Sequence, residues 1–378
     1  MPSNDATHEL VRRIHASPER AVISVTGGGS LAMSRLLCVP GASQTVLEAR
    51  VPYSTAALDD WLGLPPEQAC SSATARAMAM AGYRRAEHLR GTETFPVVGL
   101  GLTASLASDR PKRGAHRIHL AAQSASCTWS QSIELVKEAR SRDEEETLAA
   151  ELLLDLFSEA CGLQHRPEVV LRADETLERR RTDAPQSWQE LMAGRCDRIS
   201  ARAESAAARE GAVGIFPGSF NPLHDGHRRM HALAEARLGG PVHYEISIEN
   251  VGKFPLDYED MANRSRQLAA ELDFTRAPRM VQKARLYPGR TIVCGLDTIT
   301  RVADVKFAEG SETHRDRTIA EIAALGCRFL VFGRATPNGF QTLDDLELPP
   351  ALRAISTGLT EAEFREDVSS TALRRQAD

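Results

Sequence analysis

The stretch that decides the fold of this chain is Gly214-Ile215-Phe216-Pro217-Gly218-Ser219-Phe220-Asn221-Pro222-Leu223-His224-Asp225-Gly226-His227. It begins as the end of an apolar strand, from Ala212 to Phe216, turns through glycine and proline, and enters a helix. Such a strand, glycine turn and helix N-terminus favour bound phosphate, because backbone N–H groups and the helix dipole point at the anion. His224 and His227 share one face at the start of this helix, where imidazoles can bind a triphosphate and stabilise charge during phosphoryl transfer. The structural alternative is a strand-to-helix loop that carries two surface histidines.

The run G-S-F-N-P-L-H-D-G-H resembles the signature of the H-x-G-H nucleotidyltransferases, in particular the nicotinamide and nicotinate mononucleotide adenylyltransferases. The resemblance implies a Rossmann-like, doubly wound parallel sheet over residues 212–378. It also implies ATP and a phosphorylated small-molecule acceptor as partners, with Mg²⁺ bound through the phosphates and no dedicated protein cage for it. His224 and His227 would be catalytic. The residues expected to receive the nucleotide are Phe216, Gly218, Ser219, Phe220 and Asn221.

A second motif of this family, I-S-S-T-x-I-R, is similar to Val368-Ser369-Ser370-Thr371-Ala372-Leu373-Arg374 near the end of the chain. By the resemblance, Ser369, Ser370 and Thr371 bind ATP phosphates and Arg374 balances the leaving group. Taken alone, S-S-T is also a common helix cap.

Further candidates follow the next strands of the second half. The recurring alternation of strand and helix from Val213 to Val331 predicts a parallel sheet with right-handed crossovers. Lys253 follows a strand at 242–248 and can reach a phosphate as a further catalytic residue, although a lone lysine is often only solvated. Gly295 and Asp297 follow a strand at 290–294. The glycine permits close approach of a nucleotide and the carboxylate can accept a ribose hydroxyl, with a helix-capping turn as the alternative.

Length and composition favour two soluble domains. The chain has 378 residues, of which 42% are hydrophobic and 26% charged, with a formal net charge of −5. This balance implies no general affinity for nucleic acid. The seven cysteines are scattered without a C-x-x-C pair, which favours reduced thiols in a cytoplasm over zinc or disulfides. No apolar run has the length of a membrane span or a signal core, so we expect a cytoplasmic protein without a membrane partner.

The first half also contains a strand that enters a glycine-rich turn. Arg20 to Val25 reads as a buried strand, followed by Thr26-Gly27-Gly28-Gly29-Ser30 and an apolar helix. With Val51-Pro52-Tyr53-Ser54 and Cys70-Ser71-Ser72-Ala73-Thr74-Ala75, the order resembles the C-terminal domain of the CinA family, whose members deamidate nicotinamide mononucleotide. The resemblance covers Glu9 to Leu163 and implies an α/β domain over 1–163 and a homo-oligomer. It also implies a pocket formed by Ser24, Thr26, Gly27, Gly28 and Tyr53, with Ser24 as the nucleophile.

Departures from the CinA pattern predict that deamidase activity is lost. An acidic residue of the family is replaced by Ile23, and a lysine suited to activating a serine is replaced by Leu58. The later glycine-rich phosphate segment is changed to the run from Gly99 to Ala107. The basic run from Arg110 to Arg117 can hold a phosphate or form a solvated turn.

Residues 164–211 are polar and mixed and predict a connector, with a helix from Ser187 to Ala193 and a solvated triplet from Arg179 to Arg181. Both halves resemble enzymes that handle nicotinamide mononucleotide. We therefore expect a nucleotidyltransferase that forms a dinucleotide in NAD biosynthesis or salvage. The alternatives are an adenylyl- or cytidylyltransferase of another acceptor and a regulatory protein that binds pyridine nucleotides.

Overall fold

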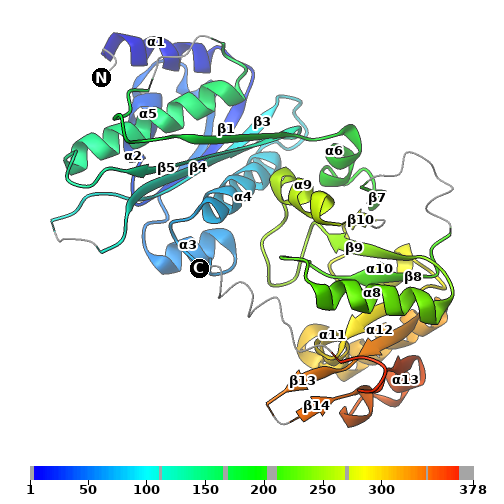
Figure 1. Cartoon of the computed structure of the whole chain (residues 1–378). Helices are drawn as coiled ribbons and strands as arrows, with labels where there is room; N and C mark the ends of the chain where they lie inside the picture. Colours follow the sequence, from blue (N-terminus) through cyan, green and yellow to red (C-terminus); the bar gives the residue numbers. More distant parts are fainter. Residues whose placement is uncertain are drawn as a thin grey trace. The chain divides into compact units, whose positions relative to one another are not determined.

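The computed structural model describes residues 4–109, 113–164, 169–201, 211–268, 272–337 and 339–365 (Figure 1). The chain forms two compact units. The first unit comprises Met1–Gln189 together with Gly252–Asp260, and the second comprises Glu190–Val251 and Met261–Asp378. Each unit mixes helices with a sheet that contains parallel strands, which confirms the predicted α/β class.

The first unit contains a six-stranded sheet in the order β2-β1-β3-β4-β5-β6. Its strands are β1 (Arg20–Thr26), β2 (Val46–Arg50), β3 (Val97–Ser105), β4 (His116–Gln123), β5 (Cys127–Leu135) and β6 (Glu178–Asp183). β1 pairs in parallel with β2 and β3, whereas β4, β5 and β6 follow as antiparallel strands. The predicted strand that begins at Arg20 is thereby confirmed as β1.

Helices cover both faces of this sheet. They are α1 (Asn4–His15), α2 (Ser30–Cys38), α3 (Thr55–Leu62), α4 (Ser72–Arg90), α5 (Arg142–Ala160) and the short η1 (Ala42–Gln44). One hydrophobic core joins α1, α2 and α5 to the strands, with Val11, Leu36 and Leu152 among its buried members. The long helix α5 begins directly after Ser141, which caps it.

Helix α4 packs against the other face of the sheet at unusually short range. A Cβ atom at Gly99 would lie 2.0 Å from the carbonyl oxygen of Ala79, and one at Gly101 would lie 2.3 Å from that of Ala75. The two glycines of β3 therefore let the alanine-rich α4 approach the sheet backbone. Their role in the described structure is helix packing.

The predicted connector contains regular elements. The triplet from Arg179 to Arg181 lies in β6, an exposed edge strand, and the predicted helix is α6 (Gln186–Met192). Charged side chains are typical of an edge strand, where they discourage pairing with other chains, but they hide the apolar alternation that predicts strands. The triplet also forms ion pairs: Arg179 contacts Asp155 at 3.0 Å and Arg180 contacts Glu259 at 3.3 Å.

The second unit is built on a seven-stranded sheet in the order β15-β12-β11-β8-β9-β10-β7. The strands are β7 (Arg198–Ser200), β8 (Gly214–Pro217), β9 (Val242–Ser247), β10 (Leu272–Thr275), β11 (Thr291–Gly295), β12 (Arg328–Phe332) and β15 (Ser356–Gly358). The six strands from β15 to β10 are parallel, and β7 closes one edge as an antiparallel strand. A separate hairpin pairs β13 (Arg334–Thr336) with β14 (Gly339–Gln341).

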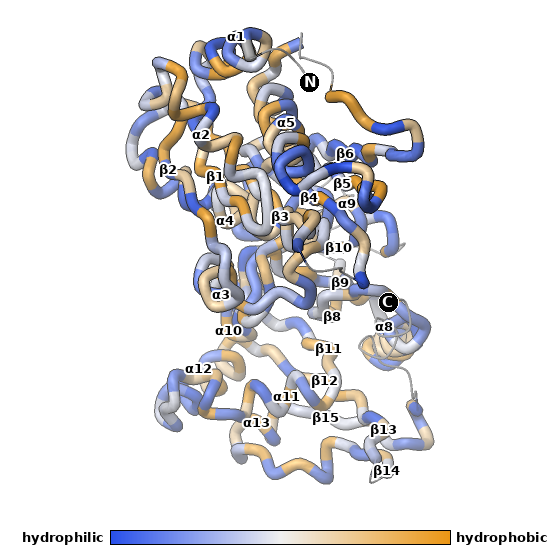
Figure 2. Tube along the Cα trace, turned by 90° about the vertical axis from the view of Figure 1, so that its left-hand side faces the viewer, coloured by the Kyte–Doolittle hydropathy of each residue, from blue (hydrophilic) through white to orange (hydrophobic). Residues whose placement is uncertain are grey.

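The helices of the second unit lie on both faces of its sheet. They are α8 (Asp225–Leu238), the part of α9 (Tyr258–Gln267) from Met261 on, α10 (Met280–Leu286), α11 (Leu296–Ala303), α12 (Glu312–Ala324), α13 (Pro350–Ala354), η2 (Val305–Ala308) and η3 (Leu343–Asp345). The neighbouring residues Tyr244 and Glu245 of β9 point to opposite faces, as successive strand residues do. His231 of α8 stacks on Tyr244, whereas Lys283 of α10 binds Glu245, so α8 and α10 cover opposite faces. In Figure 2, hydrophilic and hydrophobic colours alternate along α8, as expected for a helix that packs on one side only.

None of the helices in the described ranges combines the length and apolar character that a membrane crossing requires.

Candidate functional site

The strand order of the second unit identifies where a ligand binds most readily. From β8 the chain moves to β9 and β10 on one side, and from β11 it moves to β12 and β15 on the other. The order therefore reverses between the neighbours β8 and β11. In open parallel sheets, ligands bind outside the carboxyl ends of the strands at this reversal. β8 ends at Pro217, directly before the motif turn, and β11 ends at Gly295.

The turn after β8 is held by an aromatic residue that points inward. Phe220 has a positive φ of 44° and is 2% exposed. Its ring makes edge-on contacts with Phe216, Tyr244 and His227 at centroid distances of 5.2, 4.9 and 5.1 Å. The backbone N–H of Gly218 also donates to the carbonyl of Glu245 at 3.0 Å. The buried ring compensates for the strained backbone and fixes the path of the chain into α8.

The two histidines of the motif lie together at the N-terminus of α8. His224 occupies the N-cap, and the rings of His224 and His227 stack with centroids 3.7 Å apart. The backbone N–H of His224 donates to Nδ1 of His227 at 3.4 Å. Nδ1 of His227 is therefore the acceptor, which leaves the proton of a neutral ring on Nε2.

The charge state of His227 follows from its surroundings. Burial, reinforced by the positive charges of His224 and Arg228, lowers the pKa of His227 to about 4. The ring is neutral at pH 7 and offers one N–H donor at the positive end of a 14-residue helix. A bound anion at this helix end would favour protonation of His227.

The other predicted residues of the second half are placed as follows. Gly295 is the N-cap of α11, and Asp297 in the first turn of that helix forms an ion pair with Arg334. Both follow β11 and therefore lie at the same sheet edge as the motif turn. Ser219 and Asn221 lie within the motif turn itself.

Lys253 does not belong to the unit that contains the histidines, and the C-terminal motif is not among the described residues. Lys253 is exposed and belongs to the segment Gly252–Asp260, which is part of the first unit. Ser369, Ser370, Thr371 and Arg374 lie outside the described residues.

A cavity of the second unit lies away from the motif turn. It has a volume of about 450 Å³ and lies at α10 and α12, where Arg279, Arg285 and Arg317 are among its lining residues. None of the predicted nucleotide-binding residues lines it.

In the first unit, Ser24 does not have the surroundings of a nucleophile. It lies in β1 with 0% exposure, and its hydroxyl donates to the carbonyl of Leu100 at 3.2 Å. Tyr53 is exposed, and Leu58, at the position of the family's lysine, is buried. Thr26 is also buried, at the end of the same strand. The hydroxyl of Ser24 is therefore shielded from solvent and already bonded to the backbone.

The glycine-rich turn of the first unit is occupied by a carboxylate of the chain itself. Glu146 of α5 accepts from the N–H of Gly29 at 2.9 Å, from the N–H of Leu31 at 3.1 Å and from the hydroxyl of Ser30 at 2.9 Å. These are the groups with which a helix N-terminus binds phosphate. Gly27 is required for another reason, because a Cβ there would lie 1.9 Å from the carbonyl oxygen of Ala104.

A second carboxylate occupies the neighbouring segment. Glu145 is fully buried, accepts from the N–H of Ala107 at 2.5 Å and contacts Nδ1 of His116 at 2.8 Å. Arg142, on the same helix, donates to the carbonyl of Gly27 at 3.2 Å. Glu145 and Glu146 were not among the predicted site residues. Their acidic run is equally typical of any helix start, and nothing in its spacing points to partners that lie 29 to 117 residues earlier in the chain.

No protein-family model matches this sequence, and no curated protein matches it either. Solved structures of CinA-superfamily proteins are similar to about 43% of the chain. They include competence/damage inducible protein CihA from Agrobacterium tumefaciens, with 21% identity over 44% of this chain and 98% of that one at a TM-score of 0.33. A CinA-superfamily protein from Escherichia coli is 15% identical over 42% of this chain and 93% of that one, with a TM-score of 0.34. A CinA-superfamily protein from Klebsiella pneumoniae is 13% identical over 43% of this chain and 100% of that one, with a TM-score of 0.33.

Proposed function

We propose that this protein is a nucleotidyltransferase that transfers AMP from ATP to nicotinamide or nicotinate mononucleotide. The observation that carries the proposal is the stacked pair His224 and His227 at the N-terminus of α8, at the point where the strand order reverses. The pair lies within the motif that resembles the H-x-G-H signature. A helix N-terminus, a glycine turn and a neutral imidazole N–H form an anion site suited to a triphosphate.

In the proposed reaction, a phosphate oxygen of the mononucleotide attacks the α-phosphorus of ATP. The bond from that phosphorus to the bridging oxygen breaks, and pyrophosphate leaves. The reaction needs alignment and charge neutralisation rather than a protein nucleophile. Nε2–H of His227 would donate to a phosphate oxygen, and His224 would bind beside it. Lys253 and Arg374 would balance the charge of the leaving group.

Magnesium would enter with the triphosphate and neutralise part of its charge. Within the described ranges, no group of three His, Cys, Asp or Glu side chains is arranged to hold a metal ion.

We further propose that the first unit no longer deamidates nicotinamide mononucleotide. Ser24 is buried, and no lysine is available at position 58 to activate it. Glu146 also occupies the helix end at which a substrate phosphate would bind.

The test is an assay of the full chain with Mg²⁺, ATP and either mononucleotide, in which dinucleotide and pyrophosphate are measured by chromatography. We expect dinucleotide from the wild type and a loss of about 10²–10³-fold in kcat for His227→Ala. His88→Ala, at an exposed position of α4, is the matched control and should leave kcat unchanged. Absence of dinucleotide with both acceptors would refute the proposed acceptor. Formation of nicotinate mononucleotide without ATP would refute the loss of deamidation.

A further inference from the structure

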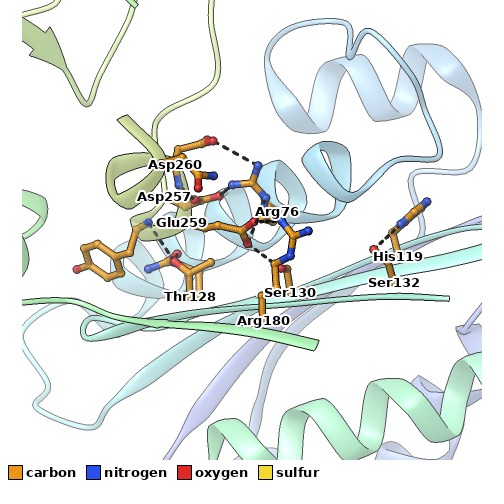
Figure 3. A network of polar contacts seen from close by, with 12 residues as sticks. Arg76, His119, Thr128, Ser130, Ser132, Arg180, Asp257, Glu259 and Asp260 are labelled. Atoms are coloured by element: carbon orange, nitrogen blue, oxygen red, sulfur yellow. Dashed lines mark hydrogen bonds and ion pairs between the residues drawn. The ribbon is translucent and has the colours of Figure 1, made fainter. Parts of the chain in front are cut away.

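Two groups of charged side chains differ in how far the protein itself compensates their charge. In the first unit, Arg76 of α4 contacts Asp257 at 2.5 Å, Asp260 at 3.3 Å and Glu259 at 3.9 Å (Figure 3). Ser130 also donates to Glu259 at 2.6 Å. The positive charge of Arg76 is therefore compensated by carboxylates of its own unit.

The cavity at α10 and α12 of the second unit has the opposite balance. Arg279, Arg285 and Arg317 are among the described residues that line its volume of about 450 Å³, and Glu321 is the one carboxylate among them. The cavity lining therefore carries an excess of two positive charges, although the whole chain has a formal net charge of −5. A concave surface with such an excess attracts anions.

The side of α12 that faces this cavity is polar throughout. His314, Arg317, Thr318 and Glu321 follow one another at positions i, i+3, i+4 and i+7, which places them on one face of the helix. The buried isoleucines of α12 belong to the hydrophobic core. The cavity is therefore formed by the polar face of a helix whose apolar face is already packed.

The three arginines differ in how strongly the protein occupies them. Arg285 donates through Nε and Nη2 to the two oxygens of Glu321 at 2.6 and 2.9 Å, which uses two of its five N–H groups and fixes the guanidinium. Arg279 lies 3.5 Å from Glu309, and both side chains are more than half exposed, so this pair is weak. Arg317 is exposed and forms no ion pair with the residues that the structure describes.

The composition of the lining restricts the chemistry of a ligand. Guanidinium groups bind phosphate and carboxylate through paired N–H groups. A phosphate group carries up to two negative charges and three acceptor oxygens, so two such groups can engage three arginines. The amide of Gln282 and the hydroxyls of Ser311, Thr313 and Thr318 can bind further oxygens. Val281 is the one apolar residue among the described lining residues, which leaves no aromatic surface on which a base could stack.

We propose that the cavity at α10 and α12 is a binding site for a small anion that carries two or more phosphate groups and no aromatic ring. Helix α10 covers the face of the sheet opposite to α8, which carries the histidine pair, so this site is separate from the proposed transferase site. The inference does not depend on the proposed function.

The test is hydrogen exchange of the full chain, titrated with inorganic pyrophosphate in a buffer without Mg²⁺. Pyrophosphate should slow amide exchange in peptides that cover 279–286 and 312–321, and the concentration for half-maximal protection gives the affinity of this site alone. Arg317→Gln and Arg279→Gln should each raise that concentration about tenfold or more, because each loses charged hydrogen bonds. Arg301→Gln is the matched control, since Arg301 is an exposed arginine of α11 that does not line the cavity.

Three further arms identify the site and its ligand. His227→Ala should retain the protection of α10 and α12, and its loss would overturn a separate site. Citrate, which carries three carboxylates and no phosphate, should protect at least about tenfold more weakly, and equal protection would overturn the choice of phosphate. ATP should protect no better than inorganic triphosphate, and stronger protection by ATP would overturn a ligand without an aromatic ring. Absence of protection by millimolar pyrophosphate, or full protection in the variant that lacks both Arg279 and Arg317, would overturn the site itself.

Discussion

A buried ion pair beneath the motif turn permits a quantitative prediction. Glu245 of β9 has 0% exposure, and its carboxylate accepts from Nζ of Lys283 at 2.7 and 2.6 Å and from the hydroxyl of Thr275 at 2.5 Å. Its backbone carbonyl holds Gly218 of the turn. We predict that Lys283→Met lowers the free energy of unfolding of the second unit substantially, because the carboxylate stays buried with one hydrogen bond.

The magnitude follows from the cost of leaving one charge of a buried pair without its partner. Breaking such a pair by removing one partner costs about 3–5 kcal/mol. We therefore expect a loss of about 3–5 kcal/mol at pH 7. Methionine has a similar volume to lysine, so a cavity adds little.

The assay must report on the second unit alone. Trp61, Trp129 and Trp188 all lie in the first unit, so tryptophan fluorescence does not follow this loss. Hydrogen exchange of peptides from β9 and α10 in the full chain measures it directly. The double variant Lys283→Met with Glu245→Gln should recover most of the loss, because no charge remains buried. A loss below about 1 kcal/mol at pH 7, or a double variant as unstable as the sum of the single variants, would refute this reasoning.

Three further predictions concern the histidine pair, the occupied glycine turn and the thiols. Burial lowers the pKa of His227 to about 4 from an ordinary 6.5, so the folded state favours the neutral ring. Because the unfolded state binds the proton more readily, the free energy of unfolding should fall as the pH drops from 6.5 toward 4. An NMR titration of this ring checks the value, and a midpoint at 6.5 would contradict it. Glu146→Ala should destabilise the first unit by about 2 kcal/mol, because α2 loses the carboxylate that caps it. Tryptophan fluorescence in urea measures this loss, and the exposed Asp143→Ala on the same helix should cost no more than about 0.5 kcal/mol. Cys38 is exposed, whereas burial raises the pKa of Cys294 to about 12, so a thiol reagent should label Cys38 in the native chain and Cys294 only after unfolding. Mass spectrometry identifies the labelled thiols, and rapid native labelling of Cys294 would count against the described burial.

The features that the sequence alone determined are local ones. The strand, turn and helix around His224 and His227 follow from a short run of residues, and their separation by three positions is enough to bring the rings together on one helix. Strand β1 and helix α5 also follow from local sequence. A fully buried strand leaves a continuous apolar run, and a helix that buries one face leaves apolar residues at helical spacing.

The features that only the tertiary structure decided depend on contacts between distant segments. Glu146 reaches the glycine turn from 117 residues away, Ser24 is buried by the elements packed around β1, and Arg76 holds carboxylates more than 180 residues further along the chain. Several ordinary structural roles are possible for an acidic run at a helix start, for a serine in a strand and for an arginine on a helix. Their partners are chosen by packing of the folded chain, which leaves no periodic signal in the sequence. For this reason the glycine turn of the first half was recognisable from its sequence, while its occupation by the protein's own carboxylate was not.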